Sequence, residues 1–430
     1  MSRTVGFLYK GNRSWYRHHS NPRALARMAA VVMLLEKRVL IWMCVLVAIN
    51  QLGFGSMVPA LPLYAQSFGV SASAIGLAIA VYGLARFMLA LPAGQLSDRL
   101  GRRPALALGG LISAAGNLWC AEADSFPEFI VARFLAGAGA GLILTTGQVV
   151  LADITTPERR GRTIAIYQGV FIFAVGIGPF PGGILAEHFG LDAPFRSYGV
   201  ASLIAAAVAW FAVGETRHLS QAQQRASGKA PLSFTRQMRE LSRQIGFVLA
   251  SMIAFMNAVA RTGGVFNLIP LLGSLRLGLT VGEIGIALAI GSVMGLVVTY
   301  PAGMLVDYFG RKAVIVPATV ISGGALLLFC FAGDYPWFLA ACIVWSVALA
   351  IGGAAPAAYA ADSAPPGMNA AAMSTFRMLG DAGYVVGPIA LGLISDLHSP
   401  ETALVVTAAM LILVGLAFAR FARETYKVVR

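Results

Sequence analysis

The stretch GQLSDRLGRR, from Gly94 to Arg103, returns in altered form as GMLVDYFGRK, from Gly303 to Lys312. The second stretch begins 209 residues after the first (94 to 303), and other landmarks repeat at the same spacing. Four matches in one register indicate a tandem duplication, and a unit of this length is half a protein rather than a solenoid repeat. The further landmarks are Pro92 and Pro301, Asp153 and Asp362, and the pairs Gly178-Pro179 and Gly387-Pro388.

Apolar residues make up 58% of the chain and charged residues only 12%, which lies outside the range of soluble domains. A helix needs roughly 20 apolar residues to span a membrane, and each copy supplies six such stretches. They lack the alternation of barrel strands, so they predict helices. We therefore expect an all-α membrane protein with twelve transmembrane helices in two pseudo-symmetric six-helix bundles. The expected spans are 39–60, 74–93, 105–122, 126–150, 163–186, 196–213, 246–270, 284–303, 314–332, 336–360, 371–395 and 402–421.

The distribution of basic residues predicts how these helices are oriented. The chain holds 32 Lys and Arg against 19 Asp and Glu, a net charge of +13. Most of the basic residues fall in the two tails and the even-numbered loops, while Arg196 and Arg276 fall on the other side. The positive-inside rule then predicts that both termini are cytoplasmic. Because topology explains the charge, the sequence argues against nucleic-acid binding.

The same features predict the organisation of the chain, which we expect to be a monomer in contact with lipid in the bacterial inner membrane. The first tail has no apolar core followed by a cleavage site, so it is not a signal peptide. It is either an unstructured segment that retains the N-terminus inside or an amphipathic surface helix over 23–36. We expect the linker to join the halves and to do little chemistry. The predicted parts are a basic cytoplasmic tail over 1–38, a bundle over 39–213, a cytoplasmic linker over 214–245, a bundle over 246–421 and a cytoplasmic tail over 422–430.

No feature of the sequence indicates catalysis, and we do not expect an enzyme. The four cysteines, Cys44, Cys120, Cys330 and Cys342, lie in or at the ends of predicted spans without metal-ligand spacing. The sequence contains no nucleotide-binding loop, metal cluster or catalytic triad, so we predict no metal and no cofactor. Any transport must therefore draw on an ion or solute gradient.

From residue 39 to 421 the sequence resembles the major facilitator superfamily. Gly94–Arg103 is similar to the signature loop of that superfamily between helices 2 and 3, and Gly303–Lys312 to its degenerate copy between helices 8 and 9. The stretch Arg133-Phe-Leu-Ala-Gly137-Ala-Gly139 resembles the Arg-and-glycine motif of helix 4. In helix 5, Gly178-Pro179-Phe-Pro-Gly182-Gly183 resembles the motif of proton-linked drug exporters, although Ala165 and Ala174 stand where glycine is usual. The resemblance implies a transporter of the 12-helix drug:proton antiporter type.

The signature loop predicts a latch on the cytoplasmic side. Gly94 lets a helix end approach another backbone closely, and Asp98 is placed to accept hydrogen bonds from the start of helix 11 near Ala370. Asp307 should act likewise on helix 5. We expect these contacts to close the cytoplasmic side in the outward-facing state and to break on inward opening. The alternative is that the arginines only hold topology. In the predicted latch, Arg102 and Arg103 pair with Asp153, and Arg311 pairs with Asp362. The other predicted members of the latch are Gly94, Asp98, Gly101, Gly303, Asp307 and Gly310.

The cluster Gly178, Pro179, Gly182 and Gly183 presents a helix face without side chains, and Pro179 removes one backbone donor. Small residues let membrane helices approach closely, and proline permits a kink. We expect this face at the seam between the halves, where it limits leak, and Gly387-Pro388 with Gly392 to repeat the device in helix 11. The alternative is a packing kink of no special role.

Charges inside the membrane indicate the site of substrate and proton, because burying a charge there is costly. Arg86, Arg133 and Arg261 are predicted at depth without a nearby acid, while Arg377 and Asp381 are four residues apart and can pair. Arg133 is either structural or part of proton coupling, Arg86 is open between structure and function, and Arg261 is the best candidate for substrate contact. Asp381 either carries the coupled proton or forms a permanent structural ion pair.

Polar residues could line a central cavity, chiefly Asn50 and Gln51 of helix 1 and Asn257 of helix 7. Exporters of cationic drugs commonly carry an acid where Asn50 and Gln51 stand, which argues against cationic drugs. An excess of arginine suits a small neutral or anionic amphipathic solute. The sequence thus predicts a secondary active transporter working by alternating access, which exchanges the solute for protons. The alternatives are an uptake or facilitative carrier of an organic anion and a transporter-like scaffold of a membrane assembly.

Overall fold

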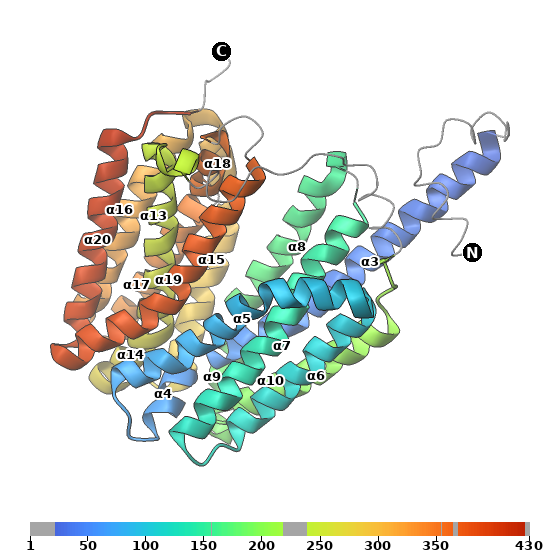
Figure 1. Ribbon diagram of the computed structural model, residues 1–430. Helices are drawn as coiled ribbons and strands as arrows, with labels where there is room; N and C mark the ends of the chain where they lie inside the picture. Colours follow the sequence, from blue (N-terminus) through green and yellow to red (C-terminus); the bar gives the residue numbers. More distant parts are fainter. Residues whose placement is uncertain (1–21, 156, 218–238, 354, 364–368, 426–430) are drawn as a thin grey trace.

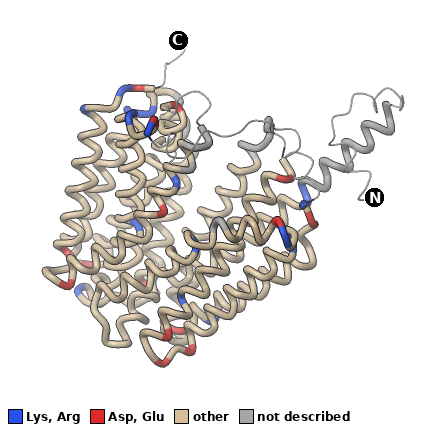
Figure 2. Tube along the Cα trace, viewed as in Figure 1, with Lys and Arg blue, Asp and Glu red and all other residues tan. Residues whose placement is uncertain are grey.

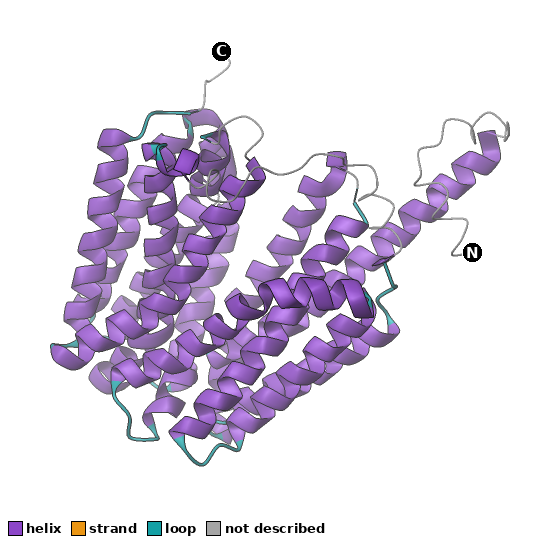
Figure 3. Cartoon of the chain, viewed as in Figure 1, coloured by secondary structure: helices purple, strands orange, loops and turns teal. Residues whose placement is uncertain are grey.

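The structure is a computed structural model that describes residues 22–155, 157–217, 239–353, 355–363 and 369–425, and in these ranges it contains helices and no strands (Figure 3). The helices bounded within these ranges fall in the two copies. In the first copy they are α3 (Pro22–Met57), α4 (Leu61–Gln66), α5 (Ala72–Leu100), α6 (Arg102–Ala121), α7 (Phe126–Asp153), α8 (Pro157–Ile177), α9 (Pro179–Phe189) and α10 (Ala193–Phe211). In the second they are α13 (Ile245–Val259), η1 (Ala260–Leu268), α14 (Ile269–Leu277), α15 (Val281–Phe309), α16 (Arg311–Phe331), α17 (Tyr335–Gly353), α18 (Ala355–Asp362), α19 (Asn369–Leu397) and α20 (Pro400–Phe421).

Each copy packs into its own bundle, as Figure 1 shows. In the first, α6 lies between α7 and α10, and α3 packs on α8 and α10. In the second, α16 lies between α17 and α20, and α13 packs on α19 and α20. Small residues bring these helices together: a Cβ on Gly116 would collide with the backbone of Ala136 on the neighbouring helix. The all-α fold in two bundles is confirmed.

Among the described residues, eleven helical stretches are long and apolar enough to cross a membrane. The twelfth predicted span, 196–213, is the helix α10, which is not among those eleven but packs within the bundle on α6 and α3. The structure starts α3 at Pro22, well before the predicted boundary at 39, so a continuous helix covers 22–38. The predicted tail therefore becomes helical before the membrane, and residues 1–21 lie outside the described part.

Two predicted spans are interrupted. The span 163–186 divides into α8 and α9 at Gly178-Pro179, where proline cannot donate the backbone hydrogen bond that would continue the helix. The span 246–270 changes from α13 into the π-helical segment η1. The first interruption lies where proline was expected to permit a kink, whereas hydropathy carried no signal of the π-helix.

The two bundles converge at one end and diverge at the other (Figure 1). We name the end that holds Gly101 and Gly310 the basic end, and the end that holds Ser71 and Thr280 the acidic end, where acidic residues mark the lower turns in Figure 2. The halves touch through α5 against α19 and through α8 and α9 against α15. A Cβ on Gly76, near the acidic end of α5, would collide with the carbonyl of Pro388, whereas a Cβ on Gly94, near its basic end, would have nothing within 4 Å. The acidic end is closed and the basic end is open.

Candidate functional site

A cavity of about 740 Å³ lies between α8 and α9 of the first half and the helices of the second half. It runs from Val58 and Phe266, deep between the halves, to Arg311 and Ala358 at the basic end. Its walls are mainly apolar, with Phe171, Phe329 and Trp345 among them. Serine and threonine hydroxyls and two arginines supply the polar groups. Such a lining suits a solute with a substantial apolar body and a small polar or charged part.

Arg261 is the charged group at the inner part of this cavity. It lies in η1, a nine-residue π-helical segment, and wide turns of this kind occur often at functional sites. Its guanidinium stands 5.6 Å from the ring centroid of Phe266, and across the described ranges it forms no ion pair with a carboxylate. Arg261 therefore presents a positive charge to the cavity, which agrees with its choice as a candidate for substrate contact.

Arg133 is placed differently, inside the first half. Its side chain is buried, its Nε donates to the carbonyl of Ala78 at 3.1 Å, and its guanidinium lies 4.5 Å from the ring centroid of Tyr82. Its Nη1 also contacts the sulfur of Met57 at 3.6 Å. The residue thus ties α7 to α5 and α3, and of the two readings of Arg133 this geometry supports the structural one.

Arg86 lies on α5 at the interface between the halves. Its guanidinium is 5.8 Å from the ring centroid of Tyr384 on α19, across the seam, which is within the range of a cation–π contact. On the same helix, the hydroxyl of Tyr82 lies 3.2 Å from that of Tyr198. Arg86 and Tyr384 therefore form a polar contact between halves near Arg261.

The predicted pairing of Arg377 with Asp381 is wrong. Both residues are exposed on α19, and no ion pair joins them among the residues that the structure describes. Two side chains one turn apart on an exposed helix face need not meet, so the four-residue spacing did not suffice. Asp381 instead belongs to α19, the helix that packs on the η1 segment carrying Arg261.

The three polar candidates do not line the cavity as predicted. Asn50 and Gln51 are buried in α3, which packs on α8 and α10 within the first half. In the described structure both amide atoms of Asn50 and the amide oxygen of Asn257 lack a hydrogen-bond partner. The rotation of α3 buries the amides of Asn50 and Gln51 in the first bundle, which the sequence period alone could not specify.

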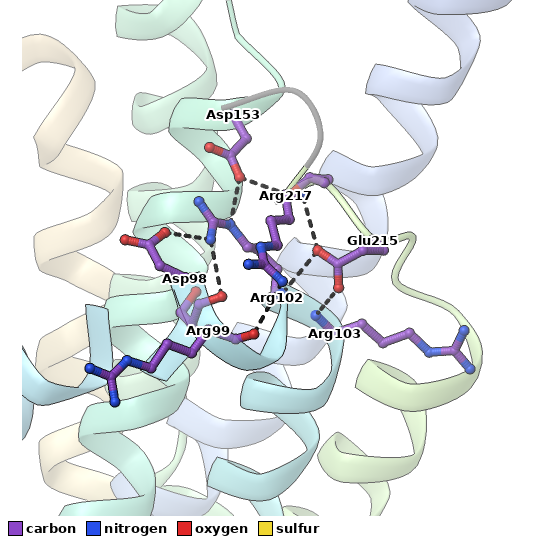
Figure 4. Close-up of polar contacts among 9 residues, drawn as sticks. Asp98, Arg99, Arg102, Arg103, Asp153, Glu215 and Arg217 are labelled. Carbon is purple, nitrogen blue, oxygen red and sulfur yellow. Dashed lines mark hydrogen bonds and ion pairs between the residues drawn. The ribbon is translucent and has the colours of Figure 1, made fainter. Parts of the chain in front are cut away.

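The signature loop forms a charged network at the basic end of the first half (Figure 4). Arg102 donates from Nε to Asp153 at 2.8 Å and from Nη1 to Asp98 at 2.6 Å. A further bond runs from Nη1 to the carbonyl of Ser97 at 3.0 Å, and Thr216 donates to Asp153 at 3.0 Å. The predicted pair of Arg102 and Asp153 is confirmed.

Two other parts of the latch hypothesis need correction. Arg103 does not pair with Asp153 but lies over Trp210, 4.9 Å from its ring centroid. Asp98 accepts from Arg102, and its side chain is 61% exposed, so it is not sealed against the start of α19. All these contacts lie within one half and are intact while the basic end is open. The arginine–aspartate pairs therefore do not have to break for this end to open.

The second copy repeats the pair of arginine and aspartate. Arg311 donates from Nε to Asp362 at 3.2 Å, and its Nη1 to the carbonyl of Val306 at 3.4 Å. The predicted pair is confirmed, and Gly310, with a φ of 94°, turns the chain between α15 and α16 as Gly101, with a φ of 104°, does between α5 and α6. The side chain of Asp307 is outside the described structure, and Gly303 lies in the last turns of α15.

Glu215 and Glu424 were missed by the sequence analysis. The carboxylate of Glu215 accepts from the backbone N–H groups of Arg102 at 3.0 Å and Arg103 at 3.1 Å. Glu424 does the same for Arg311 at 3.1 Å and Lys312 at 2.9 Å. They stand 209 residues apart (215 to 424), so the duplication spacing itself was the signal. The start of the linker and the second tail therefore hold the signature loops, which corrects the expectation that the linker only connects.

The glycine–proline face of helix 5 serves two neighbours. Gly178 and Gly182 pack on α3, where Cβ atoms would collide with Gly55 and Ser56. Gly183 and Pro179 instead meet α15 of the other half, where Pro179 would collide with a Cβ on Gly285. The face is thus only partly at the seam. In the second copy, Gly387 packs against Val259 of its own half, and Gly392 packs against Ala72 of the other half.

Comparisons with known proteins agree with this architecture. The family model described as Major Facilitator Superfamily matches residues 43–298 and 250–429. An uncharacterized MFS-type transporter of Methanocaldococcus jannaschii is 24% identical over 383 residues, which cover 89% of this chain and 97% of that protein. Multidrug resistance protein 2 of Bacillus subtilis is 26% identical over 353 residues, 81% of this chain and 86% of that one. A bacterial homologue of the human lysosomal transporter Spinster, solved in an inward-facing and occupied conformation, superposes with a TM-score of 0.74 at 16% identity, covering 89% of this chain and 95% of that chain.

Proposed function

Because the chain belongs to the major facilitator superfamily of membrane transporters, we propose that it is a secondary active transporter that exports a small neutral or anionic amphipathic solute in exchange for protons. The observation that carries this proposal is the apolar cavity with Arg261 at its inner part and no carboxylate paired with it in the described structure. An unpaired cation attracts an anionic or hydrogen-bond-accepting group and repels a cationic drug.

Alternating access follows from the same arrangement. The cavity lies between two bundles that meet at the acidic end and separate at the basic end, so rocking the bundles would expose the cavity to the two sides in turn. By the positive-inside rule we place the basic end and both termini in the cytoplasm of a bacterium and the acidic end outside the inner membrane.

Proton coupling is assigned to Asp381. In the described part of α19 it is exposed and forms no ion pair with Arg377, which supports a role other than a permanent ion pair with that residue. Because α19 packs on the η1 segment that carries Arg261, a proton bound at Asp381 would alter the charge near the substrate. Resemblance to proton-linked exporters at Gly178–Gly183 supports the direction of transport.

One alternative has its own support. An uptake or facilitative carrier of an organic anion would use Arg261 in the same way, and the cavity does not distinguish the two. The other alternative is a scaffold that no longer transports and binds a partner through the N-terminal tail. Residues 1–21 of that tail lie outside the described part of the chain.

The test is transport by the purified full chain in proteoliposomes with an imposed pH gradient, screened over anionic, neutral and cationic amphiphiles. We expect pH-driven accumulation of an anionic or neutral compound, and at least a tenfold loss in Arg261→Gln. Arg276→Gln is the matched control, because Arg276 lies at the acidic end and pairs with Glu401 away from the cavity. Preference for cations, or equal loss in both variants, would overturn the proposal.

Asp381→Asn tests the coupling. It should abolish accumulation against a gradient while leaving exchange of labelled for unlabelled substrate intact. Exchange without any pH-driven accumulation in the unaltered protein would instead favour the facilitative carrier.

A further inference from the structure

The closed acidic end contains a bond between the halves that the signature motifs do not include. Asp396, in the last turn of α19, accepts from the backbone N–H of Ala72 at 2.8 Å and from that of Ser73 at 2.9 Å. These donors are the first residues of α5 in the other half. One carboxylate thus satisfies two of the unpaired N–H groups at a helix start, where the helix dipole also favours a negative charge.

The backbone approach that permits this bond is built into the seam. A Cβ on Gly392, one turn before Asp396, would collide with the carbonyl of Ala72, and a Cβ on Gly76 with that of Pro388. Only with glycine at both positions do α5 and α19 come close enough for a short aspartate side chain to reach the opposite backbone.

The other seam holds the counterpart at the duplication spacing. Glu187, at the end of α9, precedes Asp396 by 209 residues (187 to 396), and its carboxylate occupies the space that a Cβ on Gly282 of α15 would need. In the described structure, however, no hydrogen bond joins this carboxylate to a backbone N–H of α15, whose start is capped by Thr280 as that of α5 is by Ser71. Thr280 accepts from the N–H of Glu283 at 3.1 Å, and Glu283 accepts from the N–H of Thr280 at 2.8 Å.

We propose that Asp396 locks the acidic end of the transport path while the basic end is open, and that Glu187 is its weaker duplicate. The bond joins the halves only where α5 and α19 meet, so it exists in this state and is lost when that end opens. In the open state Asp396 and the two N–H groups turn to water, so the bond favours the closed state. The proposal rests on the alternating-access part of the proposed function and on neither its substrate nor its coupled ion.

The experiment measures distances between spin labels on the two halves of the full chain in nanodiscs, with the four native cysteines replaced. Ser125→Cys and Gly333→Cys place one label on each half at exposed turns of the acidic end. Leu100→Cys and Phe309→Cys, at exposed positions of the basic end, form the second pair.

Asp396→Asn keeps the shape and removes the charge. We expect the ratio of closed to open acidic ends to fall roughly three- to tenfold, with a matching shortening at the basic end. Glu401→Gln is the control, because Glu401 is an acid at the same end whose partner, Arg276, lies in the same half. Its distances should equal those of the unaltered protein.

Ala72→Pro is a second variant that removes one donor instead of the acceptor. Proline is tolerated at the first position of a helix, and Ser71 before it already has an extended backbone, so α5 should survive. Ala72→Pro should change the label distances at both ends in the same direction as Asp396→Asn does. Because both substitutions remove the same interaction, the variant that carries both should change these distances by less than the sum of the two single effects. Unchanged distances in Asp396→Asn, or an equal shift in Glu401→Gln, would overturn the lock. A wrong substrate or ion assignment would appear in the proteoliposome assay and leave these distances unaffected.

Discussion

Arg102 and Arg311 occupy the same position in the two copies, but their surroundings differ. The side chain of Arg102 is 2% exposed and that of its partner Asp153 is 5% exposed, whereas Arg311 is 14% and Asp362 37% exposed. Arg102 reaches Asp153 at 2.8 Å, while Arg311 reaches Asp362 at 3.2 Å. Both copies keep the arginine–aspartate pair, but the pair of the second copy is more exposed. The two motifs therefore need not contribute equally to stability.

The two contacts between the halves, α5 against α19 and α9 against α15, also differ although they occupy equivalent positions in the duplication. Between α5 and α19, the carboxylate of Asp396 bonds to backbone N–H groups of the other half. Between α9 and α15, the carboxylate of Glu187 lies against Gly282 at the start of α15, but in the described structure no hydrogen bond joins it to a backbone N–H of that helix. Both helices are also capped by a hydroxyl of their own, from Ser71 in α5 and from Thr280 in α15, so the seams differ in the bond that crosses between the halves. The closed end therefore depends more on one seam than on the other.

The largest effect should come from breaking the buried ion pair. Arg102→Ala leaves Asp153 buried without its partner and should lower the free energy of unfolding by about 3–5 kcal/mol. Arg311→Ala, in the more exposed copy, should lower it by about 1 kcal/mol or less. Apparent unfolding temperatures of the purified variants in detergent measure the difference. Equal losses would mean that burial does not separate the two copies.

Adding a methyl group at either seam should block closure of the acidic end. Gly76→Ala meets Pro388 and Gly285→Ala meets Pro179, both at backbone atoms that cannot move aside easily. We expect an overpacking penalty of about 1–3 kcal/mol against the closed state and a corresponding rise in cysteine labelling from the acidic side. Gly324→Ala is the control, because a Cβ there has nothing within 4 Å. Normal labelling of both seam variants would contradict close packing.

The helix starts at the basic end should be stabilised by the two glutamates found in the structure. Glu215→Gln and Glu424→Gln should each lower stability by roughly 0.5–2 kcal/mol, as loss of a helix cap does. The Glu215 variant should show the larger change, since α6 also carries the buried Arg102 network. Thermal unfolding monitored by intrinsic fluorescence tests this, and a larger effect at Glu424 would reverse the ranking of the copies.

The smallest effect is expected at Arg377. Its counterpart in the first copy is Gln168 (168 to 377), so Arg377→Gln restores the residue of the other half. Because Arg377 is exposed and forms no ion pair with Asp381 in the described structure, stability should change by about 0.5 kcal/mol or less. The pH dependence of transport should also stay the same. A shifted pH profile would restore the predicted coupling between the two residues.

The sequence alone determined the duplication, the apolar spans and hence the two bundles, because hydropathy and a fixed spacing are local properties that lipid converts directly into helices. It also placed the pairs Arg102–Asp153 and Arg311–Asp362, whose members belong to one repeated motif. It identified Arg261 as a candidate for the cavity, since a buried charge stands out in any apolar span.

Tertiary structure alone decided which way each helix turns and where the halves touch. Asn50 is buried in the first bundle, Arg377 and Asp381 are exposed and form no ion pair with each other in the described structure, and Asp396 accepts a hydrogen bond from Ala72, 324 residues away. Helix rotation depends on the shapes of neighbours from distant segments, and a contact between halves depends on which end is closed. The spacing of apolar residues along a single helix therefore determines neither the rotation of that helix nor its contacts with the other half.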